Sequence, residues 1–338
     1  MLPLSPFTQC LGILLLFTLP IFKWLRIRYT KQAGKNTVQA TKDITTPQKR
    51  PESQPLSSQR DEVDPSRDNI DPTAAMQPYQ PYDAFLVLDV EATCQPGTDF
   101  DYANEIIEWP VCLLRWKHKD KNGNASRLEI VDEFRSFVKP VWRPQLSSFC
   151  TALTGITQDN VDSAPLFHTL LHTSFHDFLA RNGLIDAVTG ARLVPFCWCT
   201  DGPWDVRDFV VKQCFISKIR LPPWLSGDVM DVRRVVTRWL EKNDPQRRAT
   251  GSVAFTSPRR KSLPITRQLH LLGLGAFEGR QHCGIDDTRN VARIVIELAR
   301  QGMPLRANTP VNPRRRWQWM GKNGKVLEEF VRPATPTL

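Results

Sequence analysis

The clearest pattern in the sequence is a series of apolar runs that begins well inside the chain. The run Ala84–Leu88 is unbroken, which predicts a strand buried on both faces, and it ends at an acidic residue, Asp89. Two further strands are predicted at 106–116 and 130–138, with a turn around 121–124 between them. Together these three strands predict a meander.

The second half of the chain alternates between helical and strand patterns. Short strands are predicted at 194–200 and 228–230, and the apolar spacing around them is helical. Strands followed by alternating helices and strands predict an α/β domain in which helices flank a mixed sheet. The predicted helices cover residues 146–154, 166–182, 203–218, 232–243 and 291–298.

The beginning of the chain has a different character. Residues 1–22 carry no charged side chain, and basic residues follow at once. Positive charge after an apolar stretch favours a membrane anchor whose C-terminal side faces the cytoplasm. The stretch is short for a bilayer span and is interrupted by Pro20, so a mitochondrial targeting segment and an inert start are kept as alternatives. The basic residues are Lys23, Arg26, Arg28 and Lys31.

Composition divides the chain into four parts. Residues 1–31 form the hydrophobic N-terminal segment. Residues 32–80 are rich in Gln, Pro, Ser, Thr and Asp, which predicts a disordered linker because such a segment buries little apolar surface. The globular domain is expected at 81–303, with a basic insert at 245–262. The remaining residues, 304–338, form a basic and aromatic tail, which either follows a strand of RNA or packs on the domain.

Charge and cysteine content give only weak indications of the binding partner and of the cellular compartment. The formal net charge of +10 suits a partner with a phosphate backbone, although many basic proteins bind nothing anionic. The eight cysteines include neither a Cys-x-x-Cys pair nor the paired spacing of a zinc site. We therefore expect free thiols in a reducing compartment.

Candidate chemistry begins where the first strand ends. Asp89 and Glu91 are separated by one residue, so in a strand both carboxylates point to the same side. Two such carboxylates at the end of a core strand repel each other unless a cation neutralises them. This spacing predicts a divalent metal site. The alternative is a chance Asp-x-Glu at a strand-to-loop junction.

Further candidate residues lie downstream in two segments. His282 and Asp287 stand at the entrance of the last predicted helix, where exposed backbone N–H groups favour a carboxylate. Asp205 lies near the start of the helix predicted at 203–218, after a short strand, and Asp201 is an alternative four residues earlier. With the first pair, these residues make a set of three aspartates, one glutamate and one histidine.

Five motifs in this order resemble the DEDDh 3′–5′ exonucleases, and most closely the branch of histone-mRNA 3′ exonucleases and enhanced-RNAi type exoribonucleases. The similarity covers roughly residues 82–302. It implies the ribonuclease-H-like fold, with a mixed five-stranded sheet flanked by helices. The motifs are Phe85–Cys94, Asn104–Pro110, Leu146–Gln158, Thr200–Asp205 and Gly279–Asp287.

The resemblance also implies the chemistry of a metal-dependent 3′–5′ exoribonuclease, which acts on RNA with a free 3′ end and releases 5′-mononucleotides. Two Mg²⁺ ions, or Mn²⁺ in their place, would assist hydrolysis, and His282 would be the general base. The implied metal ligands are Asp89, Glu91, Asp205 and Asp287. The implied substrate contacts are Trp204, Phe149 and Glu91.

Two other functions stay open on the sequence alone. A DNA-directed exonuclease of the same fold would use the same carboxylates, because these do not distinguish the sugar. A catalytically silent, membrane-tethered RNA-binding scaffold would share the basic charge, although all five catalytic positions are filled. The sequence implies no particular protein partner.

The N-terminal segment predicts a membrane-anchored protein that faces the cytoplasm, with mitochondrial, soluble cytoplasmic and nuclear locations as alternatives. We expect the full-length chain to pellet with membranes after high-salt and alkaline washes, whereas a chain that starts at residue 32 stays soluble and active. Fractionation of cell extracts followed by immunoblotting measures this. A full-length chain that is soluble without detergent contradicts the anchor.

Overall fold

A computed structural model describes residues 77–98, 100–243 and 263–331 of the chain. The predicted N-terminal segment, nearly all of the linker and the basic insert lie outside these residues. Contacts begin at Pro78, whose carbonyl accepts a hydrogen bond from the Ala125 N–H (3.2 Å); Tyr79 then bridges to Asn124, and the side chain of Gln80 is buried. No helix in the described ranges is long and apolar enough to cross a membrane.

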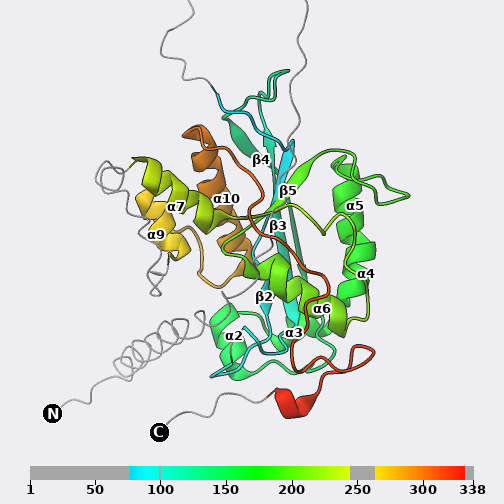
Figure 1. Ribbon diagram of the computed structural model, residues 1–338. Coiled ribbons are helices and arrows are strands. Elements are labelled where there is room, and N and C mark those ends of the chain that lie inside the picture. The colour runs from blue at the N-terminus through cyan, green and yellow to red at the C-terminus, as the bar shows by residue number, and fades with distance from the viewer. Residues whose placement is uncertain (1–76, 99, 244–262, 332–338) are drawn as a thin grey trace, which may run out of the picture. The chain divides into compact units, whose positions relative to one another are not determined.

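A mixed sheet forms the centre of the described domain (Figure 1). Strand β3 pairs antiparallel with β1 and β4, while β5 runs parallel to β1 on one side and to β6 on the other. The fold class expected from the sequence is confirmed. The strands are β1 (Ala84–Leu88), β2 (Glu91–Ala92), β3 (Ile106–Trp116), β4 (Leu128–Phe137), β5 (Phe196–Thr200) and β6 (Val229–Asp231).

The sheet has six strands in place of the five expected, because pairing along the first strand is interrupted. Leu88 lies opposite Val111 of β3, and the same register resumes with Glu91 opposite Glu108. Strand β2 is therefore a short continuation of β1 beyond a break at residues 89–90. The break frees the backbone around Asp89 from the ladder at the point where the acidic motif begins.

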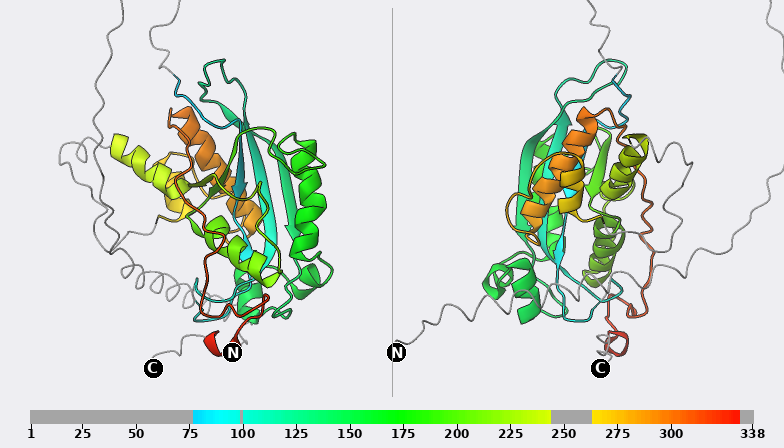
Figure 2. Two further views of the ribbon diagram at one scale, coloured as in Figure 1. Left: turned by 45° about the vertical axis from the view of Figure 1, so that its right-hand side comes forward. Right: turned by 90° about the vertical axis from the view of Figure 1, so that its left-hand side faces the viewer.

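Helices cover both faces of the sheet (Figures 1 and 2). Phe85 and Val87 pack with α7, α9 and α10, whereas the alternate residues Leu86 and Leu88 pack with α4 and α5, as the two-residue period of a strand requires. The helices are α2 (Ser148–Thr154), α3 (Gln158–Asp162), α4 (Phe167–His172), α5 (Ser174–Arg181), the π-helical η2 (Asp205–Val210), α6 (Val211–Ile216), α7 (Val232–Asn243), α9 (Ile265–Leu271), α10 (Gly284–Arg300) and the 3₁₀-helical η3 (Glu328–Phe330).

Two of the predicted helices are not continuous α-helices, and the one predicted at 291–298 begins earlier, at Gly284. The helix expected at 166–182 divides at Thr173, whose backbone leaves the helical region (φ −121°, ψ −104°). The break lets Phe167 and Phe175, one from each half, both contact the buried ring of Trp109. The helix expected at 203–218 begins with the wider turn η2, and such turns are frequent at functional sites.

The predicted C-terminal tail packs on the domain as far as it is described. Trp317 and Trp319 are buried with residues that include Tyr102 and Ile216. Of the two alternatives for the tail, packing is therefore the one that the structure supports for these tryptophans.

The beginning of α10 lies against the end of β1 because its first residue is a glycine. The Gly284 N–H donates to the Glu108 carboxylate (3.1 Å). A Cβ at this position would lie 2.9 Å from the carbonyl oxygen of Asp89 and 3.0 Å from both Glu108 Oε2 and Pro110 Cγ. Gly284 thus allows α10 to bring its first turn, and with it Asp287, to the end of β1.

Replacement of this glycine tests that packing. In an uncrowded helix Gly→Ala stabilises by about 1 kcal/mol. We expect Gly284→Ala to have the opposite sign and to destabilise the domain by about 1–3 kcal/mol, because the added methyl group overpacks the contact with Asp89. Chemical denaturation measures the change. A variant as stable as the wild type, or more so, would show that α10 can move away from β1 without cost.

Candidate active site

Four predicted acidic residues gather from three distant segments. Asp89 follows β1, Glu91 lies in β2, Asp205 opens η2 and Asp287 lies in the first turn of α10. The N–H of Val90 donates to Asp205 Oδ1 (3.0 Å), which ties η2 to the break after β1. Asp205 and Asp287 are buried, whereas Asp89 and Glu91 are partly exposed.

Electrostatics shows that these carboxylates influence one another. Although Asp89 and Glu91 are partly exposed, neighbouring atoms remove water from their carboxyl groups. This desolvation, followed by repulsion from Asp205, Asp287 and Glu91, raises the pKa of Asp89 well above its ordinary value. Desolvation also leads the causes that raise the pKa of Glu91 well above its ordinary value, and Asp287 and Asp205 add to it. The pKa values of Asp205 and Asp287 rise to about 7, chiefly through burial.

Asp201 and Asp205, the two alternatives for the third acidic residue, have different surroundings. Asp201 forms a bidentate ion pair with Arg233 (2.9 and 2.5 Å) and accepts a hydrogen bond from Gln268 (2.7 Å). Its charge is therefore balanced within the protein. Asp205 instead accepts a hydrogen bond from a backbone N–H at the end of β1. The structure thus gives Asp201 a supporting role and leaves Asp205 beside Asp89.

The donor set fits a hard divalent cation. All four carboxylates are oxygen ligands, and none of them enters an ion pair among the described residues. Buried acidic groups without a counterion are costly, and a bound cation removes that cost. Within the same residues, no three His, Cys, Asp or Glu side chains form a complete metal-binding cluster. The carboxylates therefore interact electrostatically without enclosing an ion by themselves.

His282 is held at the site by its backbone. Its φ of 60° is in the left-handed region, and its carbonyl accepts a hydrogen bond from Arg280 (3.3 Å). The other end of the Arg280 guanidinium donates to the carbonyls of Ala152 (3.0 Å) and Leu153 (2.8 Å) in α2. Arg280 thus fastens the loop of His282 to the last turn of α2, whose final carbonyls need partners.

The imidazole of His282 is exposed, and no contact in the described part of the chain joins it to the four carboxylates. Crowding by neighbouring atoms still removes some water from the ring. This desolvation, and then the positive charge of Arg280, lower the pKa of His282 below its ordinary value. The ring is therefore neutral at pH 7 and able to accept a proton.

Trp204, one of the two predicted substrate-binding rings, is fixed by its neighbours. Gly202 has φ 97°, and a Cβ there would lie 2.1 Å from the Trp204 ring, so only glycine permits the ring to lie over the backbone. The ring of Phe100 stacks on Trp204 with centroids 5.1 Å apart and planes 9° apart. Phe149, the second predicted ring, is partly buried on α2, and the aromatic pairs of the described residues do not join it to Trp204.

Comparison with known proteins agrees with this geometry. A sequence model of the RNase T family, described as "Exonuclease", matches residues 86–214. The 3′-5′ exonuclease eri1 of Schizosaccharomyces pombe is 33% identical over 261 residues, which cover 73% of this chain and 76% of the relative. Human 3′-5′ exoribonuclease 1 is 35% identical over 67% of this chain and 55% of the relative.

A solved structure extends the similarity to the fold. The nuclease domain of 3′hExo, a DEDDh family member bound to rAMP, superimposes with a TM-score of 0.54 and 32% identity, over 69% of this chain and all of that domain. The chain belongs to the DEDDh family of 3′–5′ exonucleases. The family expected from the sequence is thereby confirmed, as is the 3′–5′ exoribonuclease activity for which its relatives are named. The chain spans little more than half the length of the human relative.

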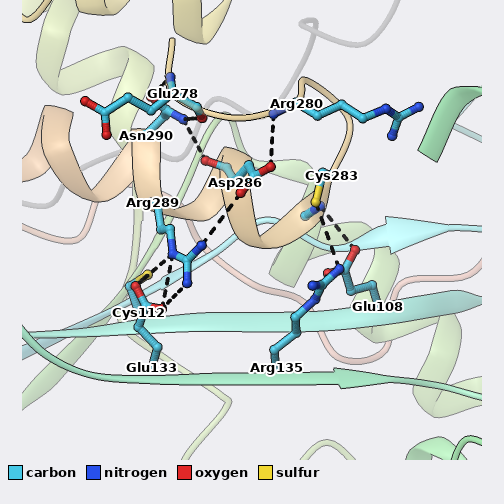
Figure 3. A network of polar contacts seen from close by, with 11 residues as sticks. Glu108, Cys112, Glu133, Arg135, Glu278, Arg280, Cys283, Asp286, Arg289 and Asn290 are labelled. Carbon is cyan, nitrogen blue, oxygen red and sulfur yellow. Dashed lines mark hydrogen bonds and ion pairs between the residues drawn. The ribbon is translucent and has the colours of Figure 1, made fainter. Parts of the chain in front are cut away.

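Glu108 is a buried carboxylate of the exonuclease site that sequence reasoning missed. It is fully buried opposite Glu91, and it bonds both to Arg135 Nε (2.7 Å) and to the N–H of Gly284 (Figure 3). It therefore links β3, β4 and α10 directly behind the acidic cluster. A signal for it existed in the sequence, because it is the one charged residue within the apolar run 106–114.

A second set of polar contacts holds the outer side of α10 (Figure 3). Arg289 forms an ion pair with Glu133 of β4 (2.6 Å). Asp286 accepts from the backbone N–H of Arg280 (2.9 Å), which joins the loop of His282 to the first turn of the helix. These contacts keep His282 and Asp287 in register with the sheet.

The raised pKa values predict how stability depends on pH without divalent ions. Asp205 and Asp287 ionise at about 7 when folded and near 3.8 when unfolded, so between these values only the unfolded chain releases the protons. The free energy of unfolding should therefore fall as pH rises from about 4 to about 7, and level off above. Urea denaturation in EDTA across this range measures it.

The comparison with Asp205→Asn isolates this effect from other titrating groups. The asparagine oxygen can still accept the Val90 N–H, but it carries no charge, so the fall should be smaller in this variant. The control is Asp159→Asn, at an exposed position on α3. Its free energy of unfolding should fall with rising pH as that of the wild type does. Equal slopes for the wild type and Asp205→Asn would contradict the raised pKa.

Proposed function

We propose that this chain is a metal-dependent 3′–5′ exoribonuclease that removes 5′-mononucleotides from RNA with a free 3′ end. One observation carries the proposal. Carboxylates from three distant segments meet at the end of β1, where Asp205 and Asp287 raise the pKa values of Asp89 and Glu91, and the four form no ion pair among the described residues. Such a cluster is suited to binding cations, and family membership supports the same reaction.

Mg²⁺, with Mn²⁺ as a substitute, is the cofactor that we propose, in two ions per site. Asp89, Glu91, Asp205 and Asp287 would hold them, and Asp89 is the best candidate to bridge both because it interacts with each of the other three. When bound, the ions activate the attacking water and stabilise the leaving oxygen. The protein's part is to keep four carboxylates together, while the nearby Arg233 forms its ion pair with Asp201.

His282 is the proposed general base. Its pKa below the ordinary value keeps the imidazole neutral at pH 7, so it can accept the proton of the attacking water. The contacts of Arg280 with α2 and of Asp286 with the same loop fix the backbone from which the ring projects. The exposure of the ring leaves it accessible to substrate and water.

The substrate contacts are also proposals. The solved nuclease domain of 3′hExo is described as bound to rAMP, and the human relative is named an exoribonuclease, which favours RNA as the substrate of this chain. Trp204 stands directly before Asp205, and Phe149 lies on the helix to which the loop of His282 is fastened. We propose that these rings, together with Glu91, hold the 3′-terminal nucleotide.

A nuclease assay with matched variants tests the proposal. RNA labelled at its 5′ end should shorten stepwise from the 3′ end in Mg²⁺, release 5′-mononucleotides, and stay intact in EDTA. Asp205→Asn should lower the rate to background while RNA binding persists, because the charge that holds the ions is reduced. His282→Ala should slow hydrolysis by about 10²–10⁴-fold with metal dependence retained.

The controls separate this reaction from its alternatives. Asp159→Asn and His168→Ala change the same residue types at exposed positions, and both should keep full activity. A 3′-phosphate should block the enzyme, and a circular RNA should survive. Faster degradation of DNA of the same sequence would identify a DNA-directed exonuclease, and full activity in EDTA or in Asp205→Asn would refute metal-assisted hydrolysis.

A further inference from the structure

The loop Phe100–Asn104, which we call the aromatic loop, lies between β2 and β3. A buried lysine binds it through hydrogen bonds. Lys212 of α6 has no exposed surface, and its ammonium donates to the carbonyls of Phe100 and Tyr102 (2.9 Å for Tyr102) and to Asn104 Oδ1 (3.4 Å). Three acceptors from one short loop converge on this cation. The lysine thus fixes the path of the loop.

The C-terminal segment Asn312–Val331, which we call the strap, covers the same loop. It runs along α6, in red in Figures 1 and 2. The Trp319 indole N–H donates to the carbonyl of Asp101 (2.6 Å), and Trp317 lies under the Lys212 ammonium, 5.2 Å from ring centroid to Nζ. Arg315 of the strap also pairs with Asp208 of η2. The strap therefore contacts the aromatic loop and the helix of Asp205 together.

The C-terminal end of the strap is joined to the aromatic loop through residues 142–143 of the domain. Glu328 accepts hydrogen bonds from the Trp142 indole N–H and from Arg143 (both 2.7 Å). Arg143 donates in turn to the hydroxyl of Tyr102 in the aromatic loop (2.8 Å). The carboxylate of Glu105, at the loop's end, accepts from the backbone N–H groups of residues 141–143. The loop is thus enclosed by strap and domain together.

The aromatic loop begins at Phe100, whose ring contacts the tryptophan that precedes Asp205. Phe100 stacks in parallel on Trp204 and contacts Phe209 edge-on (5.9 Å). Trp204 precedes Asp205, and its ring also has the Arg233 guanidinium 5.0 Å from its centroid. Phe100 is therefore the link between the strap and the tryptophan beside the catalytic acidic residue.

We propose that Phe100 is a positioning residue for Trp204, and that the strap, by fixing the aromatic loop, sets the affinity for the 3′-terminal base. The inference rests on the proposed role of Trp204 as a nucleotide-holding ring. Loss of Phe100 would remove one of the contacts that hold the Trp204 ring, beside Gly202 and Arg233, and would let the ring turn more readily away from the base. Neither residue touches the reacting atoms, so the change should fall on KM for the RNA 3′ end and leave kcat nearly unaltered.

A double-mutant cycle on two substrates tests this link in the full-length chain. Trp204→Ala should raise KM on the order of 5- to 150-fold, the range for loss of a base stack. Phe100→Ala should raise KM about 2- to 12-fold, and Phe100→Tyr, which keeps the ring, should behave as the wild type. In the Trp204→Ala background Phe100→Ala should add nothing. On RNA that ends in an abasic ribose, Phe100→Ala should have no effect on KM.

The strap is tested by a substitution that keeps its packing. Trp319→Phe removes the hydrogen bond to Asp101 but retains a buried ring, and we expect it to raise KM in the same direction as Phe100→Ala and to spare the abasic substrate. Gln318→Ala, an exposed strap position, is the matched control and should change nothing. Thermal denaturation of each variant confirms that it is folded at the assay temperature.

The outcomes distinguish the inference from the function on which it rests. If Trp204→Ala leaves KM unchanged, the proposed nucleotide contact fails, and the inference fails with it. In a second set of outcomes, Trp204→Ala raises KM while Phe100→Ala leaves KM unchanged, raises KM further in the Trp204→Ala background, or raises KM equally on the abasic RNA. In each of these cases the nucleotide contact stands and only the link through Phe100 is overturned. A neutral Trp319→Phe overturns the part played by the strap.

Discussion

Repulsion among carboxylates at the end of β1 is the constraint on which the rest of the structure depends. Neighbouring carboxylates raise the pKa values of Asp89 and Glu91 there, and burial raises those of Asp205 and Asp287 to about 7, so the polypeptide must hold four acidic groups together at the cost of their charge until cations are bound. The burial of apolar side chains on both faces of β1 supplies the favourable free energy that offsets this repulsion. Gly284 and Glu108 determine how closely α10 approaches β1, and thereby where Asp287 lies.

The protein distinguishes acidic residues that support the site from those that form it. Asp201, Glu108 and Glu133 are each paired with an arginine, and Glu105 is surrounded by backbone N–H groups. These partners satisfy the supporting carboxylates within the fold. The metal-binding candidates have no such arginine among the described residues, and their charge is available to ligands that come from solvent. Buried acidic residues close together can thus have opposite roles.

Much of this architecture was predictable from the sequence, because it depends on short-range periodicity. The unbroken apolar run Ala84–Leu88 predicted the strand covered on both faces, and the one-residue spacing of Asp89 and Glu91 predicted that both acidic residues lie on one side. The choice of Asp205 over Asp201 required a family motif, because both precede or begin the same helix. Their partners distinguish them physically, because Arg233 and Gln268 bind Asp201 whereas the Val90 N–H binds Asp205.

The features that were not predictable depend on partners far apart in the chain. The break at Thr173 follows from two rings packing on Trp109, and the importance of Gly284 follows from the backbone of Asp89. The order in which the chain is made gives these long-range contacts a further meaning. The bond between Gly284 and Glu108 spans 176 residues, and His282 and Asp287 are encoded after every strand of the sheet. A nascent chain therefore completes the strands of its sheet before it acquires the first turn of α10, and a chain that stops before residue 282 lacks two of the five residues proposed for hydrolysis, His282 and Asp287.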